Sequence, residues 1–363
     1  MKKLVIAVLV FCWIGAGNLR AQSDDWKEGI IKEEFIYEDA PFPSAHAATI
    51  EETDQGLVSA WFGGTDEGDD DVGIWISRHE NGTWTAPEEV ATGVQDEEKR
   101  YPSWNPVLYH TPNGKTKLFY KVGPSPSTWW GMVITSDDGG ETWSAPEKLP
   151  EGILGPIKNK PVLLENGDLI AGSSTEDDGW KVHMEISPDF GKTWTKVGPL
   201  NKGEEFQAIQ PAILTHGDGT LQILARSQSR AIVESWSHDY GQSWSPMKKS
   251  ILPNNNSGLD AVTLDDGRHL LVYNHVRPPK GAERGKAERT PLNVAVSEDG
   301  KSWSAALVLE DSKISQYSYP SVIQLKDGMV HIVYTWRRER IKYVKVDPSK
   351  LDLHAMEQGH WPE

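Results

Sequence analysis

The sequence predicts an all-β protein folded as a six-bladed β-propeller, because two periodic signals run in step along it. Five segments end in a polar turn, then Thr or Ser, then Trp, and the closing Trp residues lie 59, 51, 50 and 59 positions apart. Six tight-turn signals between short apolar runs recur as well, with glycines 58, 53, 52, 48 and 61 positions apart. Self-similarity at such a period indicates a repeat architecture.

Each repeat reads as four strands: strand, tight hairpin, strand, loop, strand, Trp-ended turn, strand. Six such units arranged radially make a propeller. The sixth unit has no Trp-ended turn, and the N-terminal stretch 30–37 has no blade of its own. We therefore expect residues 30–37 to supply the missing outer strand, which closes the ring and covers an open edge. No linker divides the chain, so residues 22–363 are expected to form one domain.

The N-terminus has the pattern of a secretory signal peptide over residues 1–21. Lys2 and Lys3 precede an apolar run at 4–16, and residues 19–21 suit cleavage. The run is short for a membrane span. The sequence thus predicts a secreted or periplasmic protein without membrane insertion. The one cysteine, Cys12, lies inside this segment, so no disulfide is expected in the mature chain.

Composition and missing motifs narrow the function. The formal net charge of −16 disfavours nucleic acid and anionic membranes as partners. The sequence has no phosphate-binding loop, dinucleotide fingerprint, serine nucleophile elbow or zinc-type Cys/His cluster. Neither a cofactor nor a metal ion is therefore expected.

The Trp-ended turns resemble the Asp-box, S-x-D-x-G-x-T-W, of the sialidase (neuraminidase) superfamily. The copies at 136–143, 187–194 and 237–244 fit in full if Ser is allowed for Thr. The copy at 297–303 is one residue short, and the copy at 77–84 has His79 in place of Asp. The resemblance covers essentially the whole mature chain and implies the fold. The box aspartates are expected to accept backbone N–H groups within the turns, which is a structural role.

Strand direction places a candidate ligand site at the end of the propeller opposite the hairpins and Asp-boxes. The starts of the inner strands and the loops after the second strands converge there. This end is rich in cationic and polar residues, which suits a negatively charged sugar. Alternatively, several of them point to solvent or pair with carboxylates. The candidate substrate-binding residues are His46, Asn105, Lys121, Lys160, Gln210, Arg226, Arg277, Arg289 and Arg337.

The resemblance to sialidases implies a carboxylate-binding site of three arginines. Arg226, at the end of a strand followed by a box, fits the second, and Arg289, before the strand into the next box, fits the third. The first belongs to an Arg-Ile-Pro motif that enters blade one. The corresponding stretch here, residues 42–46, contains no arginine.

The resemblance also implies a tyrosine nucleophile near the start of the last blade, assisted by a glutamate entering blade four. Tyr317, followed by Ser318, fits the tyrosine, with Tyr319 a close rival. A phenol needs such help because its ordinary pKa is near 10. Blade four offers Gln207 and Gln210 instead, with two glutamates just upstream.

The family's acid/base aspartate lies in the loop after the second strand of blade one. Five carboxylates crowd this loop here, and Asp66, Glu67 and Asp71 are the candidates. Mutual repulsion would raise one pKa towards the range useful for an acid. A calcium-binding loop and a merely solvated loop are alternative interpretations. Asp260, at the start of blade five, is a spare carboxylate that would suit an inverting scheme.

Together these features predict an exo-glycosidase that hydrolyses a terminal, acidic sugar from glycans, with exo-α-sialidase as the single best guess. Three alternatives stay open: a hydrolase for a uronic acid or deoxysugar, a lyase that cleaves a uronate by β-elimination, and a glycan-binding propeller without activity. The oligomeric state is not predicted.

Overall fold

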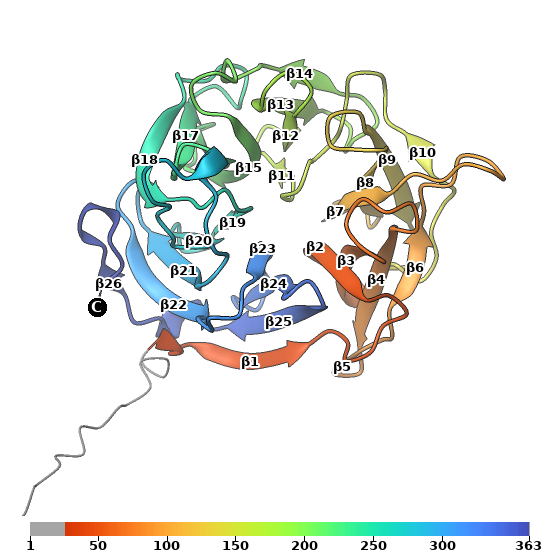
Figure 1. Ribbon diagram of the computed structural model, residues 1–363, viewed down its shortest axis with the longest axis horizontal. Helices are drawn as coiled ribbons and strands as arrows, with labels where there is room; N and C mark the ends of the chain where they lie inside the picture. The colour runs from red at the N-terminus through yellow and green to blue at the C-terminus, as the bar shows by residue number, and fades with distance from the viewer. Residues whose placement is uncertain (1–25, 363) are drawn as a thin grey trace, which may run out of the picture.

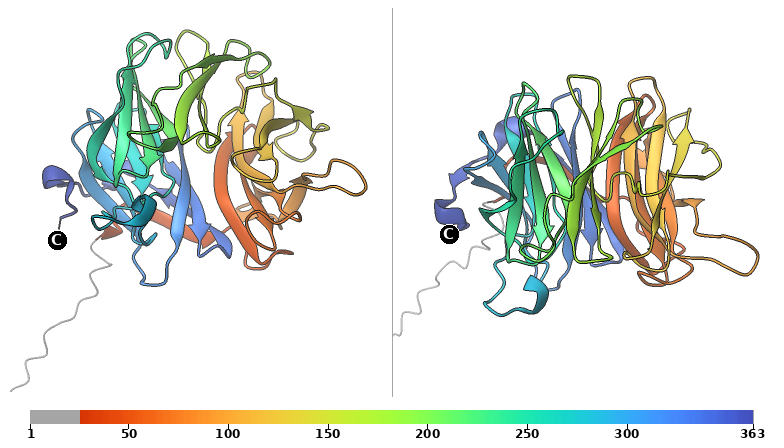
Figure 2. Two further views of the ribbon diagram at one scale, coloured as in Figure 1. Left: turned by 45° about the horizontal axis from the view of Figure 1, so that its top comes forward. Right: turned by 90° about the horizontal axis from the view of Figure 1, so that it is seen from above.

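The computed structural model describes residues 26–362, which form six β-sheets arranged in a ring around a central axis (Figure 1). This confirms the predicted six-bladed propeller. The predicted signal segment, residues 1–21, lies outside the described residues. Seen from the side, the strands run between the two ends of the ring, and the loop that carries the short 3-10 helix η2 (Glu283–Gly285) projects from one end (Figure 2).

Each blade is an antiparallel sheet whose strands follow one another outward from the axis. The strands of blades one to three are β2 (Ser44–Thr53), β3 (Gly56–Gly64), β4 (Gly73–Glu80), β5 (Thr83–Trp84) and β6 (Glu88–Ala91); β7 (Ser103–His110), β8 (Thr116–Val122), β9 (Trp130–Ser136) and β10 (Glu147–Lys148); and β11 (Val162–Leu163), β12 (Leu169–Thr175), β13 (Lys181–Ser187) and β14 (Thr195–Val197).

Blades four to six follow the same order. Their strands are β15 (Ala208–Thr215), β16 (Leu221–Ser227), β17 (Ala231–Ser237) and β18 (Lys248–Pro253); β19 (Asp260–Thr263), β20 (His269–Tyr273), β21 (Leu292–Ser297), β22 (Ser304–Glu310) and β26 (His354–Ala355); and β23 (Tyr317–Gln324), β24 (Val330–Trp336), β25 (Arg340–Val346) and β1 (Ile30–Phe35). Two further 3-10 turns, η3 (Pro348–Lys350) and η4 (Glu357–Gly359), flank β26.

The N-terminal strand closes the ring, as predicted. β1 is the outermost strand of blade six and pairs antiparallel with β25, from Ile30 opposite Val346 to Phe35 opposite Lys342. The first strand of the chain therefore completes the sheet of the sixth blade, which links the N-terminal segment to β25.

The Asp-boxes are turns held by their own side chains. In the box at 136–143, the Asp138 carboxylate accepts the backbone N–H of Thr142 at 2.9 Å and its hydroxyl at 2.5 Å. These bonds, with the one from Ser136, lower the pKa of Asp138 to about 2. The Trp residues pack across blade boundaries: the Trp194 ring lies 6.0 Å from that of Phe119 in blade two. The structure thus gives the boxes the structural role expected.

Apolar cores lie between neighbouring blades, whereas the axis of the ring is polar. One core joins Ile74 of blade one to Leu118 of blade two. On the axis, Lys158 donates hydrogen bonds to the backbone carbonyls of Leu259 and Pro320. Because hydrogen bonds rather than apolar contacts fill the centre, polar side chains at the inner strand ends can face a shared cavity.

Within residues 26–362, no helix has the length and apolar character needed to cross a membrane.

Candidate functional site

Four inner strands carry a bulge at the same place, and in three of them, β7, β15 and β23, a polar or aromatic residue followed by proline forms the bulge. Asn105 in β7, Gln210 in β15 and Tyr319 in β23 have φ values of 37°, 57° and 53°. Left-handed backbone is uncommon outside glycine, and such strain gathers at functional sites. A bulge also redirects a side chain. All three residues line one pocket.

Tyr319 lies at the centre of this pocket and is almost fully buried. Its hydroxyl oxygen accepts hydrogen bonds from Nη1 of Arg226 and, at 3.4 Å, from Nε2 of Gln210. The ring lies against that of His46, with centroids 4.1 Å apart. Burial and the nearby guanidinium groups hold the pKa of His46 well below its usual value, so this imidazole is neutral. These contacts hold the phenol in place beside the pocket.

Three arginines surround the pocket, each oriented by a partner. Arg226 donates to Oδ1 of Asn256 at 2.8 Å and stacks over Trp180 at 5.0 Å. Arg289 donates to Oε1 of Gln316 at 3.0 Å, and its guanidinium lies 5.4 Å from the centre of the Tyr319 ring. Burial lowers the pKa of Arg289 to about 10, which still leaves it charged at neutral pH.

The third arginine, Arg338, comes from the turn between β24 and β25. Its side chain pairs with Glu67 at 2.7 Å, and its backbone carbonyl accepts the N–H of Ala45 at 2.7 Å. This contact places Arg338 beside residues 42–46, the stretch that lacks the arginine expected from the sialidase pattern. Blade six thus brings a guanidinium to the start of blade one.

Two carboxylates share the pocket with the arginines. Glu67, in the acidic loop of blade one, is held by Arg338. Glu176, in the loop after β12, is half-buried, and this burial raises its pKa in spite of the neighbouring Arg226. The pocket encloses about 180 Å³ and has indole walls from Trp104 and Trp129. Because pockets for drug-sized ligands are roughly 300–1,000 Å³, this one suits a single ring.

The family model described as a BNR repeat-like domain matches residues 55–332, which is most of the chain. The chain belongs to the BNR-repeat proteins of the sialidase superfamily.

Relatives in this superfamily are distant. An anhydrosialidase of Macrobdella decora is 23% identical over 270 residues, which cover 66% of this chain and 35% of the relative. A sialidase of Paraclostridium sordellii is 27% identical over 241 residues, which cover 57% of each. This chain therefore spans only part of the length of either relative. The solved NanB sialidase of Streptococcus pneumoniae has the same fold, with a TM-score of 0.69 at 13% identity, covering 89% of this chain and 71% of that one.

The pocket brings together six of the site residues predicted from the sequence. They come from five blades and are Glu67, Asn105, Gln210, Arg226, Arg289 and Tyr319. His46 packs against the Tyr319 ring, and its Nδ1 shares a hydrogen bond of 2.8 Å with the Thr335 hydroxyl. The neutral amide of Gln210 lies beside Tyr319, where the resemblance to sialidases led us to expect a glutamate.

Tyr317 and Arg337, by contrast, do not line the pocket. Tyr317 is buried between blades five and six, with its hydroxyl 2.7 Å from that of Ser312. Arg337 stacks over Trp336 at 4.9 Å and lies 3.8 Å from Glu339. Tyr319 lines the pocket in place of Tyr317, and Arg338 lines it in place of Arg337. The sequence predicts Tyr317 from the Tyr-Ser pair and Arg337 from its place in a loop, and neither argument takes account of the bulge at Tyr319 or the turn at Arg338.

Four more predicted residues are held elsewhere. Lys121 is completely buried and donates to the carbonyl of Pro156, so it has no surface for a ligand. Arg277 is exposed on the loop after β20 and donates to the carbonyl of Ile251 at 3.3 Å. Lys160 and Asp260 form an ion pair of 2.9 Å on the axis, where Asp260 also accepts the N–H of Val322. These contacts are structural.

The acidic loop places only Glu67 in the pocket. Asp71 accepts the backbone N–H and the hydroxyl of Thr65, and Asp66 accepts the N–H of Glu67 at 2.8 Å. Both are exposed and shape the loop. Among residues 26–362, no three His, Cys, Asp or Glu side chains lie close enough together to hold a metal ion.

Sequence reasoning missed Arg338 and Trp129. It placed Trp104 and Glu176 at this end of the propeller but did not make them candidates. A signal for the site was present, however. Asn105, Gln210 and Tyr319 each precede a proline at the same place in their repeats. Aligning the repeats on these X-Pro pairs identifies Tyr319, rather than Tyr317, as the residue that faces the axis.

Proposed function

We propose that this chain is a glycoside hydrolase that removes a terminal acidic sugar from a glycan. The observation that carries the proposal is the position of Tyr319 among Arg226, Arg289 and Arg338 in one small pocket. Guanidinium groups bind carboxylates with paired hydrogen bonds. A pocket of this size, with three guanidinium groups against two carboxylates, favours one negatively charged ring.

The pocket also supports roles for Tyr319 and Glu176 in cleavage. Glycoside hydrolysis needs an acid for the leaving oxygen and a group facing the anomeric carbon, where positive charge develops. Glu176 suits the acid, because burial raises its pKa. Glu67 is already paired with Arg338. As the bond between the anomeric carbon and the glycosidic oxygen breaks, Glu176 gives its proton to that oxygen while Tyr319 faces the carbon. A water molecule then forms a bond to the anomeric carbon and gives a proton back to the Glu176 carboxylate.

Sialic acid is the first sugar to test, because the superfamily and both relatives bear sialidase names. The experiment is a screen of the purified protein against aryl glycosides of sialic acid, glucuronic acid, galacturonic acid and neutral sugars. Release from an acidic glycoside alone supports the proposal. Release only from neutral glycosides, or undiminished activity in Arg226→Ala and Arg289→Ala, contradicts it.

The residue beside Tyr319 favours a second candidate, a uronate lyase. Gln210 lies where the resemblance to sialidases led us to expect a glutamate, and a neutral amide cannot accept the phenol proton. Arginines that bind a carboxylate, together with a tyrosine, also suit β-elimination, in which a proton is lost next to the carboxylate and the glycosidic bond breaks. A lyase would release an unsaturated sugar that absorbs in the ultraviolet, whereas a hydrolase gives a saturated one.

We also propose that the protein acts outside the cytoplasm, on the strength of the N-terminal pattern at residues 1–21. Expression of the full chain in a bacterial host, followed by N-terminal sequencing of the exported protein, tests this. A mature N-terminus near residue 22 is expected, and an intact Met1 in the cytoplasm would contradict it.

A further inference from the structure

The loop between β20 and β21, residues 274–291, projects from the pocket end of the propeller and carries η2 at its tip (Figure 2). We call it the η2 loop. Arg284 and Gly285, at the tip, have left-handed backbone with φ values of 51° and 63°. A Cβ atom on Gly285 would lie 2.4 Å from the backbone carbonyl oxygen of Gln228 in blade four. The tip therefore packs directly on the backbone of blade four, at a position that requires glycine.

Asn256, just before blade five, connects this tip to the central pocket. Its Nδ2 donates a hydrogen bond of 2.9 Å to the backbone carbonyl of Arg284, and its Oδ1 accepts one of 2.8 Å from Nε of Arg226. Asn256 is 2% exposed, so water does not compete for these two bonds. Its own φ is 60°, and backbone strain of this kind gathers at functional sites. One buried amide thus holds both a pocket arginine and the tip of the η2 loop.

Trp180, in the loop after β12, is a second contact that Arg226 and the tip share. The guanidinium groups of Arg226 and Arg284 lie 5.0 and 5.5 Å from the centre of its ring. The backbone of Trp180 is fixed, because its N–H donates to Oε1 of Gln207 at 3.0 Å and its carbonyl accepts from Nδ2 of Asn201 at 2.9 Å. The indole is therefore a firm support on which both guanidinium groups stack.

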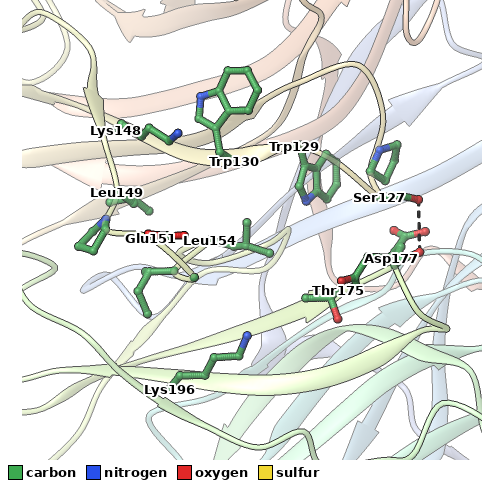
Figure 3. A pocket seen from close by; sticks show the side chains of 15 residues that line it. Ser127, Trp129, Trp130, Lys148, Leu149, Glu151, Leu154, Thr175, Asp177 and Lys196 are labelled. Carbon is green, nitrogen blue, oxygen red and sulfur yellow. Dashed lines mark hydrogen bonds between the residues drawn. The ribbon is translucent and has the colours of Figure 1, made fainter.

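The loop that carries Trp180 also carries Glu176, the proposed proton donor. At the edge of the groove between blades two and three, the hydroxyl of Ser127 donates a hydrogen bond of 3.2 Å to the backbone carbonyl of Glu176 (Figure 3). Burial raises the pKa of Glu176, and the guanidinium groups of Arg226 and Arg284 oppose this shift, so both lie close to the carboxylate. The tip of the η2 loop therefore lies beside the acid of the proposed reaction as well as its arginine.

We propose that Asn256 is a positioning residue for Arg226 and couples this arginine to the η2 loop. Its carbonyl oxygen holds the guanidinium and its amide nitrogen holds the tip, so order in one favours order in the other. The effect on the substrate rests on the proposed function, because Arg226 is expected to bind the sugar carboxylate. The coupling itself is a property of the free protein.

Limited proteolysis tests the coupling without any substrate. Lys280, Arg284 and Lys286 are exposed trypsin sites in the η2 loop, and trypsin cuts a loop at a rate that depends on how often the loop opens. Arg226→Met removes the guanidinium and leaves the loop sequence intact. Cleavage after the three loop residues, mapped by mass spectrometry, is expected to be at least fivefold faster than in wild type. An unchanged rate overturns the proposal.

Arg338→Met is the matched control for proteolysis. Arg338 also lines the central pocket, but its side chain pairs with Glu67 instead of Asn256. Cleavage of the η2 loop in this variant is expected to stay within twofold of wild type. An acceleration as large as in Arg226→Met would show that the loss of any pocket arginine loosens the loop, and this would also overturn the proposal.

Two substitutions at Asn256 separate its two contacts. Asn256→Ala loses both, whereas Asn256→Asp keeps an oxygen for Arg226 and loses the donor to Arg284. Trypsin should therefore cut the loop at least fivefold faster in both. With the acidic aryl glycoside that wild type cleaves fastest, KM should rise about tenfold in Asn256→Ala, since a hydrogen bond to a charged group is lost, while kcat stays within threefold. KM should return to within threefold of wild type in Asn256→Asp. An equal rise in both variants would contradict the positioning role.

Asn255→Ala is the kinetic control. Asn255 is equally buried and also anchors the η2 loop, but its Nδ2 donates to the backbone carbonyl of Glu288 at 2.6 Å rather than holding Arg226. Its KM is expected to stay within twofold of wild type, and a rise as large as in Asn256→Ala would overturn the proposal. If wild type cleaves no glycoside, the hydrolase proposal fails and the trypsin rates alone decide the coupling. If wild type is active but Arg226→Met leaves the loop uncut, the coupling fails and the hydrolase proposal stands.

Discussion

Arg226 donates a hydrogen bond to the hydroxyl oxygen of Tyr319, although the two residues are 93 positions apart and belong to blades four and six. The bond joins two blades that are not neighbours in the ring, and Gln210 contacts both partners. The site therefore forms only when blade six is in place beside the other blades. A change that displaces Tyr319 in blade six is expected to displace Arg226 as well.

Tyr319→Phe is expected to lower kcat by about a hundredfold or more, since losing a group that acts directly on the reacting centre costs roughly 10²–10⁴. The ring stays in place, so the fold should be retained. Tyr317→Phe is the matched control. It loses only a hydrogen bond with Ser312, which costs about 1 kcal/mol of stability, and its activity should stay within about threefold of wild type. A larger loss of activity in Tyr317→Phe would make Tyr317 the catalytic tyrosine, as the sequence first predicted.

The pair Tyr317 and Tyr319 also shows what the sequence could predict. The six blades, the closing strand 30–37 and the end that carries the site follow from periodicity, which is a property of whole repeats. The choice between two tyrosines depends on one bulge, because an extra residue exchanges the two faces of a strand. The choice between Arg337 and Arg338 depends on a turn. The bulge can be recognised in the sequence when the repeats are aligned on their X-Pro pairs, whereas the turn has no such signal.

Arg338→Ala is expected to reduce kcat/KM for an acidic glycoside about thirtyfold, because a charge-assisted hydrogen bond is worth about 1.5–3 kcal/mol. Arg337→Ala, one position away, loses a long surface contact with Glu339 and the stacking over Trp336, both outside the pocket, and should change kcat/KM less than about twofold. Steady-state kinetics of the two variants decide this. Equal effects would mean that Arg338 does not contact the substrate.

Glu176→Gln tests the proton donor through its pH profile. A general acid must be protonated, so activity falls as the pH rises through its pKa, and burial places that fall at a higher pH than for an ordinary glutamate. The variant should lose this alkaline limb and about a hundredfold of kcat with an oligosaccharide. With an aryl glycoside that has a good leaving group, the variant should lose much less of its kcat. A wild-type alkaline limb that persists in the variant would assign the acid to another residue.

Lys121→Met tests whether this buried lysine is structural. Burial lowers its pKa from 10.5 to about 7, so between these values the unfolded chain binds a proton that the folded chain does not. Stability therefore rises with pH across that window. Lys158, whose pKa burial also lowers to about 7, contributes in the same way. The variant should show a smaller rise between pH 7 and pH 9.5 in urea unfolding, with KM unchanged. A raised KM would return Lys121 to the binding site.

The most direct test of the central claim is a crystal structure of the protein soaked with the acidic sugar that its best aryl substrate releases. The account predicts that the sugar carboxylate lies within hydrogen-bond distance of Arg226, Arg289 and Arg338, with the anomeric carbon over the Tyr319 hydroxyl. A sugar bound with its carboxylate away from these arginines would contradict the account.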